Sequence, residues 1–182
     1  MAALEIPVFI SKEEIEGVVS RIGSEIYKNL QDNRAKEVNF VTILEGARPF
    51  SRDLRAKVTE LCGQRFPINN YDIKISSYQG TQSEKLALEK DIEVDITGRD
   101  LIVVEDIVDT GKTMNYLINH LFMKRNARSM CICSLLNKPS RREKDIPIVY
   151  LGKNIPDEFV IGYGLDKDGE FRGLDYIGIW KE

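Results

Sequence analysis

A stretch near the N-terminus repeats apolar residues at the spacing of one face of an α-helix. The residues on this face are Ile15, Val18, Val19, Ile22, Ile26 and Leu30. The preceding segment, Ser11-Lys12-Glu13-Glu14, has the form of a capping box, in which the serine and the second glutamate satisfy each other's backbone N–H groups. We therefore expect a helix that begins just after Ser11.

Three short runs have a different pattern, because they are almost entirely apolar and rich in β-branched residues. They cover Val38–Leu44, 101–104 and 130–136. Two segments with helical spacing lie between them, one that starts near Pro49 and one at 113–124. Apolar strands that alternate with amphipathic helices predict an α/β fold, with a mostly parallel sheet covered by helices on both faces.

The other segments are shorter or less regular. We expect a strand at 71–77 and short strands at 146–151, 159–163 and 176–180, separated by Gly, Pro and Asp turns. The late strands predict a small extra lobe on the main sheet. Residues 79–89 are polar without a firm period and predict a long mobile loop, and loops of that length inside a compact domain are usually functional.

Composition and charge narrow the classes of function. The chain has 182 residues, enough for one globular domain with a sizeable core. Its 26 basic and 29 acidic side chains give a net charge of −3, which argues against nucleic acid as a partner. The only histidine is His120, so a His-rich zinc site and a Ser-His-Asp triad are excluded.

Cysteines and hydropathy indicate the compartment. Cys62, Cys131 and Cys133 are odd in number, and two of them lie in an apolar run, so we expect buried, reduced thiols. No apolar run approaches the roughly 18 residues of a membrane span. The first residues also lack a signal-peptide pattern. We expect a cytoplasmic protein without membrane contact.

The stretch 101–114, LIVVEDIVDTGKTM, combines two opposite kinds of chemistry. Its second half resembles a phosphate cradle, because Gly111 permits a tight turn while backbone N–H groups and threonine hydroxyls point at an anion. A Walker A loop is excluded, since the first glycine of that motif would fall on Asp106. Glu105 and Asp106 would instead repel phosphate. Two like charges about 4 Å apart cost about 4 kcal/mol at an effective dielectric of 20, so this pair requires cations or hydroxyl donors.

A single ligand could satisfy the whole stretch if it carried a ribose, a 5′-phosphate and a magnesium-bound pyrophosphate. In agreement, VVEDIVDTGKT resembles the phosphoribosyl pyrophosphate (PRPP) signature of type I phosphoribosyltransferases. The resemblance extends over nearly the whole chain and is greatest to the hypoxanthine-guanine members. It implies the type I phosphoribosyltransferase fold as one domain over residues 1–182, with a hood from the N- and C-terminal segments and a mobile active-site loop.

The resemblance also implies roles within this stretch. Glu105 and Asp106 would bind the ribose hydroxyls and contribute to a Mg²⁺ site. Asp109 would lie near the purine N7 as general base or acid, and is the implied catalytic residue. The 5′-phosphate would be wrapped by Asp109, Thr110, Gly111, Lys112 and Thr113.

Two further segments match the part of the family site that holds the base. Lys138 would donate to the purine O6, which selects 6-oxopurines because an ammonium can only donate hydrogen bonds. The alternative is an exposed lysine at a strand end. Phe159 would stack on the base while the Val160 backbone reads its edge, and the alternative for Phe159 is a place in the core.

The remaining matches concern pyrophosphate, metal and the lid. Asp166 would contribute to the metal site and to the base's 2-position, and Arg172 would meet pyrophosphate, although this stretch also fits a solvated turn. Ser77 and Tyr78 resemble the start of the family's mobile lid. A lid would exclude water from an oxocarbenium-like transition state, which water would otherwise hydrolyse.

The sequence departs from the family pattern at one position. The family commonly has lysine before Gly46, at a non-proline cis peptide that contacts pyrophosphate, whereas this chain has Glu45. We expect the backbone at Glu45 and Gly46 to keep its role, with Arg48 as a candidate to replace the lost charge.

The resemblance therefore implies a magnesium-dependent transferase of purine salvage, which converts a 6-oxopurine and PRPP into IMP or GMP and pyrophosphate. A homodimer or homotetramer is expected on the same basis. Two alternatives stay open: a non-catalytic protein that senses PRPP or a nucleotide, and a transferase for another base, such as xanthine, adenine or a pyrimidine. Asp109, Lys138 and the lid favour catalysis, since a sensor could dispense with them.

Overall fold

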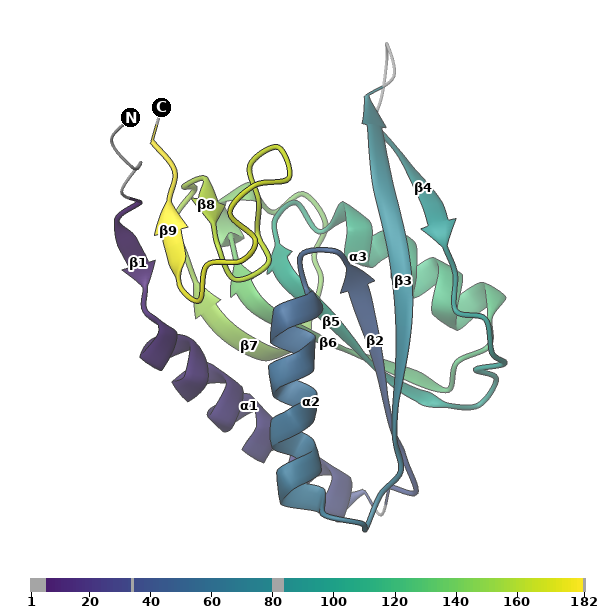
Figure 1. The fold of residues 1–182 in the computed structure, drawn as a ribbon. Helices are drawn as coiled ribbons and strands as arrows, with labels where there is room; N and C mark the ends of the chain where they lie inside the picture. Colours follow the sequence, from purple (N-terminus) through teal and green to yellow (C-terminus); the bar gives the residue numbers. More distant parts are fainter. Residues whose placement is uncertain (1–5, 34, 80–83, 182) are drawn as a thin grey trace.

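A computed structural model describes residues 6–33, 35–79 and 84–181, and its main feature is a six-stranded sheet of order β4-β3-β2-β5-β6-β7 (Figure 1). The pairs from β3 to β7 are parallel and only β4 is antiparallel to its neighbour. In chain order the elements are β1 (Val8–Ile10), α1 (Lys12–Asp32), β2 (Val38–Leu44), α2 (Arg48–Cys62), β3 (Ile68–Gln79), β4 (Glu84–Lys90), β5 (Asp100–Val108), α3 (Lys112–Leu117), the π-helical turn η1 (Ile118–Lys124), β6 (Ser129–Asn137), the 3₁₀ turn η2 (Pro139–Arg141), β7 (Ile148–Asn154), β8 (Val160–Ile161) and β9 (Ile177–Ile179). The predicted α/β fold with a mostly parallel sheet is confirmed.

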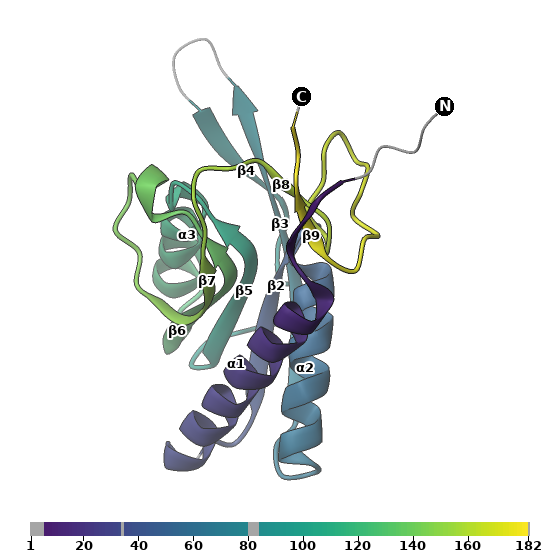
Figure 2. The ribbon, with the colours of Figure 1, turned by 90° about the vertical axis from the view of Figure 1, so that its left-hand side faces the viewer.

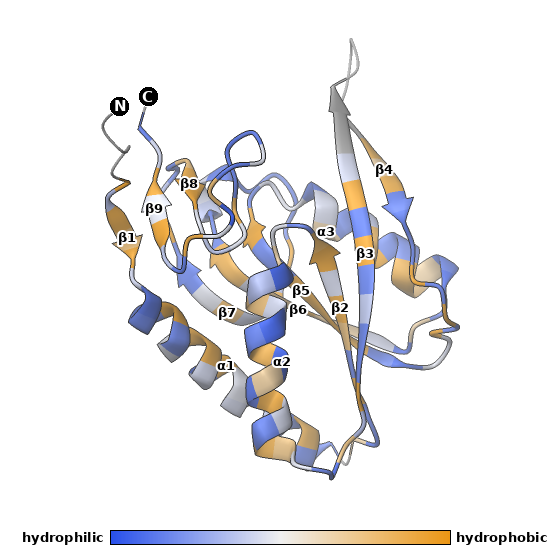
Figure 3. Ribbon diagram, viewed as in Figure 1, coloured by the Kyte–Doolittle hydropathy of each residue, from blue (hydrophilic) through white to orange (hydrophobic). Residues whose placement is uncertain are grey.

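Helices cover both faces of this sheet, as Figure 2 shows. Alternate side chains of β2 separate into two cores: Phe40 packs with α1 and α2, whereas Val41 and Ile43 pack on the face that carries α3 and η1. Figure 3 shows hydrophobic and hydrophilic residues mixed along α1 and α2, the pattern of helices with one buried side. The central strands are thus buried on both faces, and this packing holds the ends of neighbouring strands in fixed positions relative to one another.

The first helix forms where its sequence predicts. Ser11 accepts from the Glu14 amide at 3.3 Å, and the Ser11 amide donates to Glu14 Oε2 at 3.0 Å, which completes the capping box. Gly23 allows α1 to approach α2 closely, since a Cβ there would lie 2.7 Å from Lys57 Cγ. Cys62 and Cys133 are buried, free thiols as expected, whereas Cys131 is only partly buried.

A second, three-stranded antiparallel sheet joins the two ends of the chain, in the order β1-β9-β8. The short strands at 159–163 and 176–180 were expected, and they are realised as the shorter β8 and β9. β1 was not expected, because its three residues are too few to show a period. Its register with β9 is irregular between Val8 and Ile10.

Three sequence-based expectations need correction. The polar segment 79–89 is not simply a loop, because β4 begins at Glu84 and pairs with β3 from Lys74 to Gln79. The strand expected at 101–104 continues to Val108 and carries the acidic residues within it. The helix expected at 113–124 is α-helical only to Leu117 and π-helical beyond. Residues 80–83 of the expected mobile loop lie outside the described residues.

None of the helices in the described part of the chain is both long and apolar enough to cross a membrane.

Candidate active site

Three parallel strands, β2, β5 and β6, end at the same edge of the sheet, and the residues that follow or close them bear most of the predicted chemistry. Glu45 follows β2, Asp106 lies near the end of β5, and Lys138 follows β6. Glu105 is paired in register with Ser134 of β6, so hydrogen bonding to the neighbouring strand carries β5 on through its charged residues. Ligands of open α/β sheets bind beyond this edge.

Glu105 and Asp106, here called the acid pair, form an electrostatically strained corner. Glu105 is only 8% exposed, and its Oε1 accepts from the Asp106 amide at 3.2 Å. Asp106 Oδ1 accepts from the Ile107 amide at 2.7 Å. Burial, reinforced by the neighbouring Asp106 charge, holds the pKa of Glu105 well above its usual range, and burial also raises the pKa of Asp106. Within the described part of the chain neither carboxylate has an ion-pair partner.

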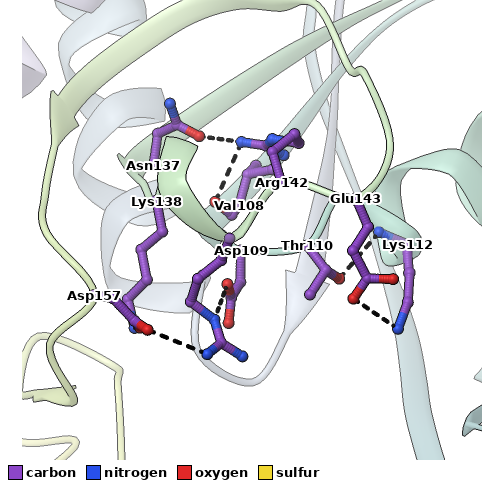
Figure 4. Close-up of polar contacts among 10 residues, drawn as sticks. Val108, Asp109, Thr110, Lys112, Asn137, Lys138, Arg142, Glu143 and Asp157 are labelled. Carbon is purple, nitrogen blue, oxygen red and sulfur yellow. Dashed lines mark hydrogen bonds and ion pairs between the residues drawn. The ribbon is translucent and has the colours of Figure 1, made fainter.

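The phosphate-cradle segment turns sharply between β5 and α3. Gly111 has a φ of 83°, and a Cβ there would lie 2.7 Å from the Lys144 carbonyl oxygen, so this position requires glycine. The Thr110 carbonyl accepts from the Glu143 and Lys144 amides at 2.9 and 3.0 Å. Lys112 Nζ also lies 3.0 Å from Glu143 Oε1 (Figure 4). The segment is therefore held by the chain that follows η2.

A cavity of about 340 Å³ collects most of the predicted site residues. Its walls include nine of them: Glu45, Gly46, Asp106, Asp109, Lys138, Phe159, Val160, Asp166 and Arg172. Five others do not line it, namely Glu105, Thr110, Gly111, Lys112 and Thr113. The side chains of Ser77 and Tyr78 lie outside the described residues, although their backbone belongs to β3.

The environments of the two residues expected to face the base exclude the structural alternative for each. The Lys138 side chain is only 10% exposed, so the exposed-lysine alternative is wrong. Phe159 is 50% exposed on the cavity wall, so its alternative as a core residue is wrong as well. Its carbonyl accepts from the Trp180 amide at 2.8 Å, while Val160 is buried.

A chain of alternating charges joins Asp109 to Lys138 and was not expected from the sequence. Arg141 Nε donates to Asp109 Oδ1 at 2.7 Å, and Arg141 Nη1 donates to Asp157 Oδ2 at 3.3 Å. Asp157 Oδ1 in turn lies 3.6 Å from Lys138 Nζ (Figure 4). We call these four residues the ion-pair chain. The adjacent Arg141 and Arg142 after Lys138 were a signal, but their partners are remote in sequence.

Arg142 holds the same region from another side. Its Nη2 donates to Asn137 Oδ1 and, at 3.4 Å, to the Val108 carbonyl oxygen (Figure 4). Its Nη1 is buried and has no hydrogen-bond partner among the described residues. A Cβ on Gly111 would lie 3.1 Å from this nitrogen.

Asp166 and Arg172 line the cavity from the segment between β8 and β9. Arg172 Nη2 lies 2.7 Å from Asp166 Oδ1, and its Nη1 donates to the Gly164 carbonyl at 2.8 Å. A Cβ on Gly164 would lie 2.0 Å from the Gly46 carbonyl, so this segment packs directly on the turn after β2. The solvated turn considered for this stretch is present at its tip, where Asp168 and Gly169 are exposed and have positive φ.

The turn after β2 has the expected peptide geometry and an unexpected pairing. The Leu44–Glu45 bond is cis. Arg48 donates to Glu45 Oε2 from Nη2 at 2.9 Å and from Nε at 3.2 Å, so the candidate replacement charge is engaged with Glu45 itself. Gly46 meets Asp106, whose Oδ2 would lie 1.7 Å from a Cβ at that position. Position 46 must therefore lack a side chain, because Asp106 packs directly against its backbone.

A larger hollow of about 700 Å³ lies between α1, α2 and the C-terminal segment, and of the predicted site residues only Arg172 lines it. Several of its other charged side chains pair with one another, as Lys12 does with Asp175 at 3.3 Å and Arg52 with Asp53 at 2.7 Å. Tyr163 donates to Asp53 Oδ2 at 2.7 Å. We therefore assign the candidate active site to the smaller cavity.

The carboxylates do not form a ready-made metal centre. Among the described residues no three His, Cys, Asp or Glu side chains are grouped so that they could hold a metal ion. Glu105, Asp106 and Asp166 thus offer oxygen ligands singly or as the acid pair. This donor set fits Mg²⁺, which usually takes one or two carboxylates together with substrate phosphates.

Known proteins are similar to this chain in sequence and in fold. The model of the phosphoribosyl transferase domain matches residues 11–168. The hypoxanthine-guanine phosphoribosyltransferase of Bacillus subtilis is 38% identical, over 96% of this chain and 92% of its own. The hypoxanthine phosphoribosyltransferase of Escherichia coli is 34% identical, over 95% of this chain and 94% of its own.

Solved structures agree with these sequence matches. A hypoxanthine-guanine phosphoribosyltransferase from Bacillus anthracis superposes with a TM-score of 0.87 at 35% identity, covering 97% of this chain and all of that one. A Trypanosoma cruzi hypoxanthine phosphoribosyltransferase gives a TM-score of 0.88 at 28% identity, covering 100% of this chain and 95% of that one. The chain belongs to the phosphoribosyltransferase family.

Proposed function

We propose that the protein transfers the 5-phosphoribosyl group of PRPP to a 6-oxopurine, hypoxanthine or guanine, and releases IMP or GMP and pyrophosphate. The observation that carries this proposal is that Asp106, Asp109, Lys138 and Arg172 line one cavity. Each of them suits a different part of the two substrates. The relatives named above as hypoxanthine and hypoxanthine-guanine phosphoribosyltransferases support the same activity in purine salvage.

The acid pair and the cradle bind PRPP. Asp106 lines the cavity and accepts from a ribose hydroxyl, and Glu105 adds its charge from beside it. The backbone N–H groups and hydroxyls of Thr110, Gly111, Lys112 and Thr113 take the 5′-phosphate. Arg172 and the backbone of Glu45 and Gly46 meet pyrophosphate, whose departing negative charge the guanidinium stabilises.

The opposite part of the cavity selects the base. Lys138 donates to O6, and the 6-amino group of adenine offers an ammonium no acceptor of comparable strength. Phe159 presents its half-exposed ring for stacking, with the Val160 backbone and Asp166 at the other edge of the base.

The reaction breaks the bond between ribose C1 and the pyrophosphate oxygen and forms a bond from C1 to a purine nitrogen. Asp109 faces the base and accepts the proton that the purine loses as the new bond forms. The β3–β4 hairpin, headed by Ser77 and Tyr78, acts as a lid that keeps water from the oxocarbenium-like transition state. Glu105, Asp106 and Asp166 are the residues that would hold Mg²⁺ together with PRPP, and the ion would supply positive charge for the leaving group.

Three further assignments belong to the proposal. The whole chain, 1–182, acts as one domain, with a hood built from its N- and C-terminal segments. The active form is a homodimer or homotetramer. The protein works in the cytoplasm, on small molecules and not on nucleic acid or membranes.

A spectrophotometric assay with PRPP and Mg²⁺ tests the activity against hypoxanthine, guanine, xanthine and adenine. We expect turnover with hypoxanthine or guanine and none with adenine. The absence of turnover with every base would contradict the enzyme proposal and favour a PRPP or nucleotide sensor. Turnover with xanthine alone would move the specificity to that base.

A further inference from the structure

Asp109 and Lys138 line the same cavity and carry opposite charges. In the proposed function both contact the base, so they must not form an ion pair with each other. Two such groups on the walls of a 340 Å³ space attract each other, and the low dielectric of a partly buried site strengthens that attraction. A direct Asp109–Lys138 ion pair would occupy the place of the base's O6 and N7 edge. In the structure each group instead has its own partner.

Those partners are Arg141 and Asp157, and neither of them lines the cavity. Arg141 binds only Oδ1 of Asp109, and within the described residues Oδ2 has no partner. Asp157 stands 3.6 Å from Lys138 Nζ, and Arg141 and Asp157 are joined at 3.3 Å. The ion-pair chain therefore runs from the cavity wall to solvent and back, with its charges alternating.

We propose that Arg141 and Asp157 are positioning residues that hold Asp109 and Lys138 apart, so that both stay available to the base. Arg141 suits this role because its Nε and Nη1 serve two carboxylates at once, which an ammonium cannot do in the same geometry. The proposal rests on the function proposed above, since it presumes that the base binds between Asp109 and Lys138.

The test measures binding without turnover. Calorimetry gives the Kd of IMP, which contains base and sugar phosphate, and the Kd of ribose 5-phosphate, which lacks the base. We expect Arg141→Gln to weaken IMP binding about tenfold, the scale of one charged hydrogen bond, and to leave ribose 5-phosphate binding unchanged. Asp157→Asn should do the same by a smaller factor, and it serves as the second variant if Arg141→Gln does not fold.

Two further variants separate positioning from general loss of structure. Arg128→Gln removes an arginine that is ion-paired to Asp100 at the opposite end of β5, and it should leave both constants unchanged. In an Asp109→Asn background, Arg141→Gln should add little, because position 109 then carries no charge that Arg141 must keep away from Lys138. Arg141→Lys should recover only part of the loss.

Several results would overturn the proposal. These are equal weakening of IMP and ribose 5-phosphate, unchanged IMP binding in both Arg141→Gln and Asp157→Asn, or fully additive losses with Asp109→Asn. The proposed function fails in a different way, visible in the wild-type protein alone: IMP would bind no tighter than ribose 5-phosphate, and no 6-oxopurine would be converted.

Discussion

The acid pair and Asp109 of the ion-pair chain lie close together in sequence, yet the protein treats their charges in opposite ways. Glu105 and Asp106 are buried together without an ion-pair partner among the described residues, and burial raises the pKa of both. Asp109, three residues later, is compensated by Arg141 at 2.7 Å and lies at the edge of solvent. The protein thus gives Asp109 a direct ion-pair partner and, among the described residues, gives none to the acid pair.

This difference follows from what each set is for. A carboxylate meant for sugar hydroxyls or a cation is compensated by the ligand when it arrives, so an internal cation would compete with that ligand. A carboxylate meant for a proton has to stay correctly oriented beside a lysine of opposite charge, so it gains from a fixed partner. The contrast implies that the free protein gives up stability at the acid pair and not at the ion-pair chain.

Asp109→Asn tests the catalytic half of the contrast and has the largest expected effect. The amide cannot take up a proton, so the turnover number should fall about 100-fold or more, the usual contribution of general acid–base catalysis. PRPP binding should change little, because the cradle is held by Glu143 and Lys144 and not by Asp109. An unchanged turnover number would show that Asp109 is not the proton-handling group.

Glu105→Gln tests the other half, through stability. In the folded protein Glu105 holds its proton to higher pH than in the unfolded chain, where its pKa is near 4.5. The protonated form therefore stabilises the fold fully below that pH, and the contribution is lost as pH rises through the raised pKa. Glutamine keeps the shape without the charge, so it should raise the free energy of unfolding at neutral pH by about 1 kcal/mol or more.

Thermal denaturation against pH, without PRPP or Mg²⁺, measures this effect. The melting temperature of the wild type should fall relative to that of Glu105→Gln as the pH rises above 4.5, the ordinary value for this group. The gap should narrow when PRPP and Mg²⁺ are added, since they stabilise the wild type selectively. A variant less stable than the wild type at neutral pH would contradict an unneutralised pair.

Glu45→Lys should have the smallest effect on stability and activity. It tests an exposed ion pair, in contrast to the buried acid pair. Glu45 and Arg48 are both largely solvated, so the loss of their pairing should alter stability by less than about 1 kcal/mol. A lysine there adds positive charge beside the pyrophosphate site, so the KM for PRPP should change more than the KM for the purine. Equal shifts in both Michaelis constants would exclude a role at pyrophosphate.

β2, β5 and β6 were predictable because each contains a buried apolar run. The apolar run of β5 ends at 104, where its acidic residues begin, so the strand was predicted to end there. It continues to Val108 because its backbone is hydrogen-bonded to β6. β4 was missed for a related reason: it is a polar edge strand whose only partner is β3. Over the seven residues of η1, the spacing of a π-helix scarcely differs from that of an α-helix.

The residues of the site also differ in whether the local sequence could reveal them. The residues that line the cavity could be found because they belong to a long local signature or to short matches elsewhere. Arg141 and Asp157 could not, since their role depends on contacts with Asp109 and Lys138 that only the fold creates. The burial that sets Glu105 apart from Asp109 is likewise a property of tertiary packing and not of the nearly contiguous sequence that holds both.

The most direct test of this division is a matrix of initial rates over PRPP and hypoxanthine concentrations, with Glu105→Gln and Arg141→Gln side by side. The acid pair serves the sugar and the ion-pair chain serves the base, so Glu105→Gln should raise mainly the KM for PRPP. Arg141→Gln should raise mainly the KM for hypoxanthine. If both variants raised the same Michaelis constant, the division of labour between the two sets of carboxylates would be contradicted.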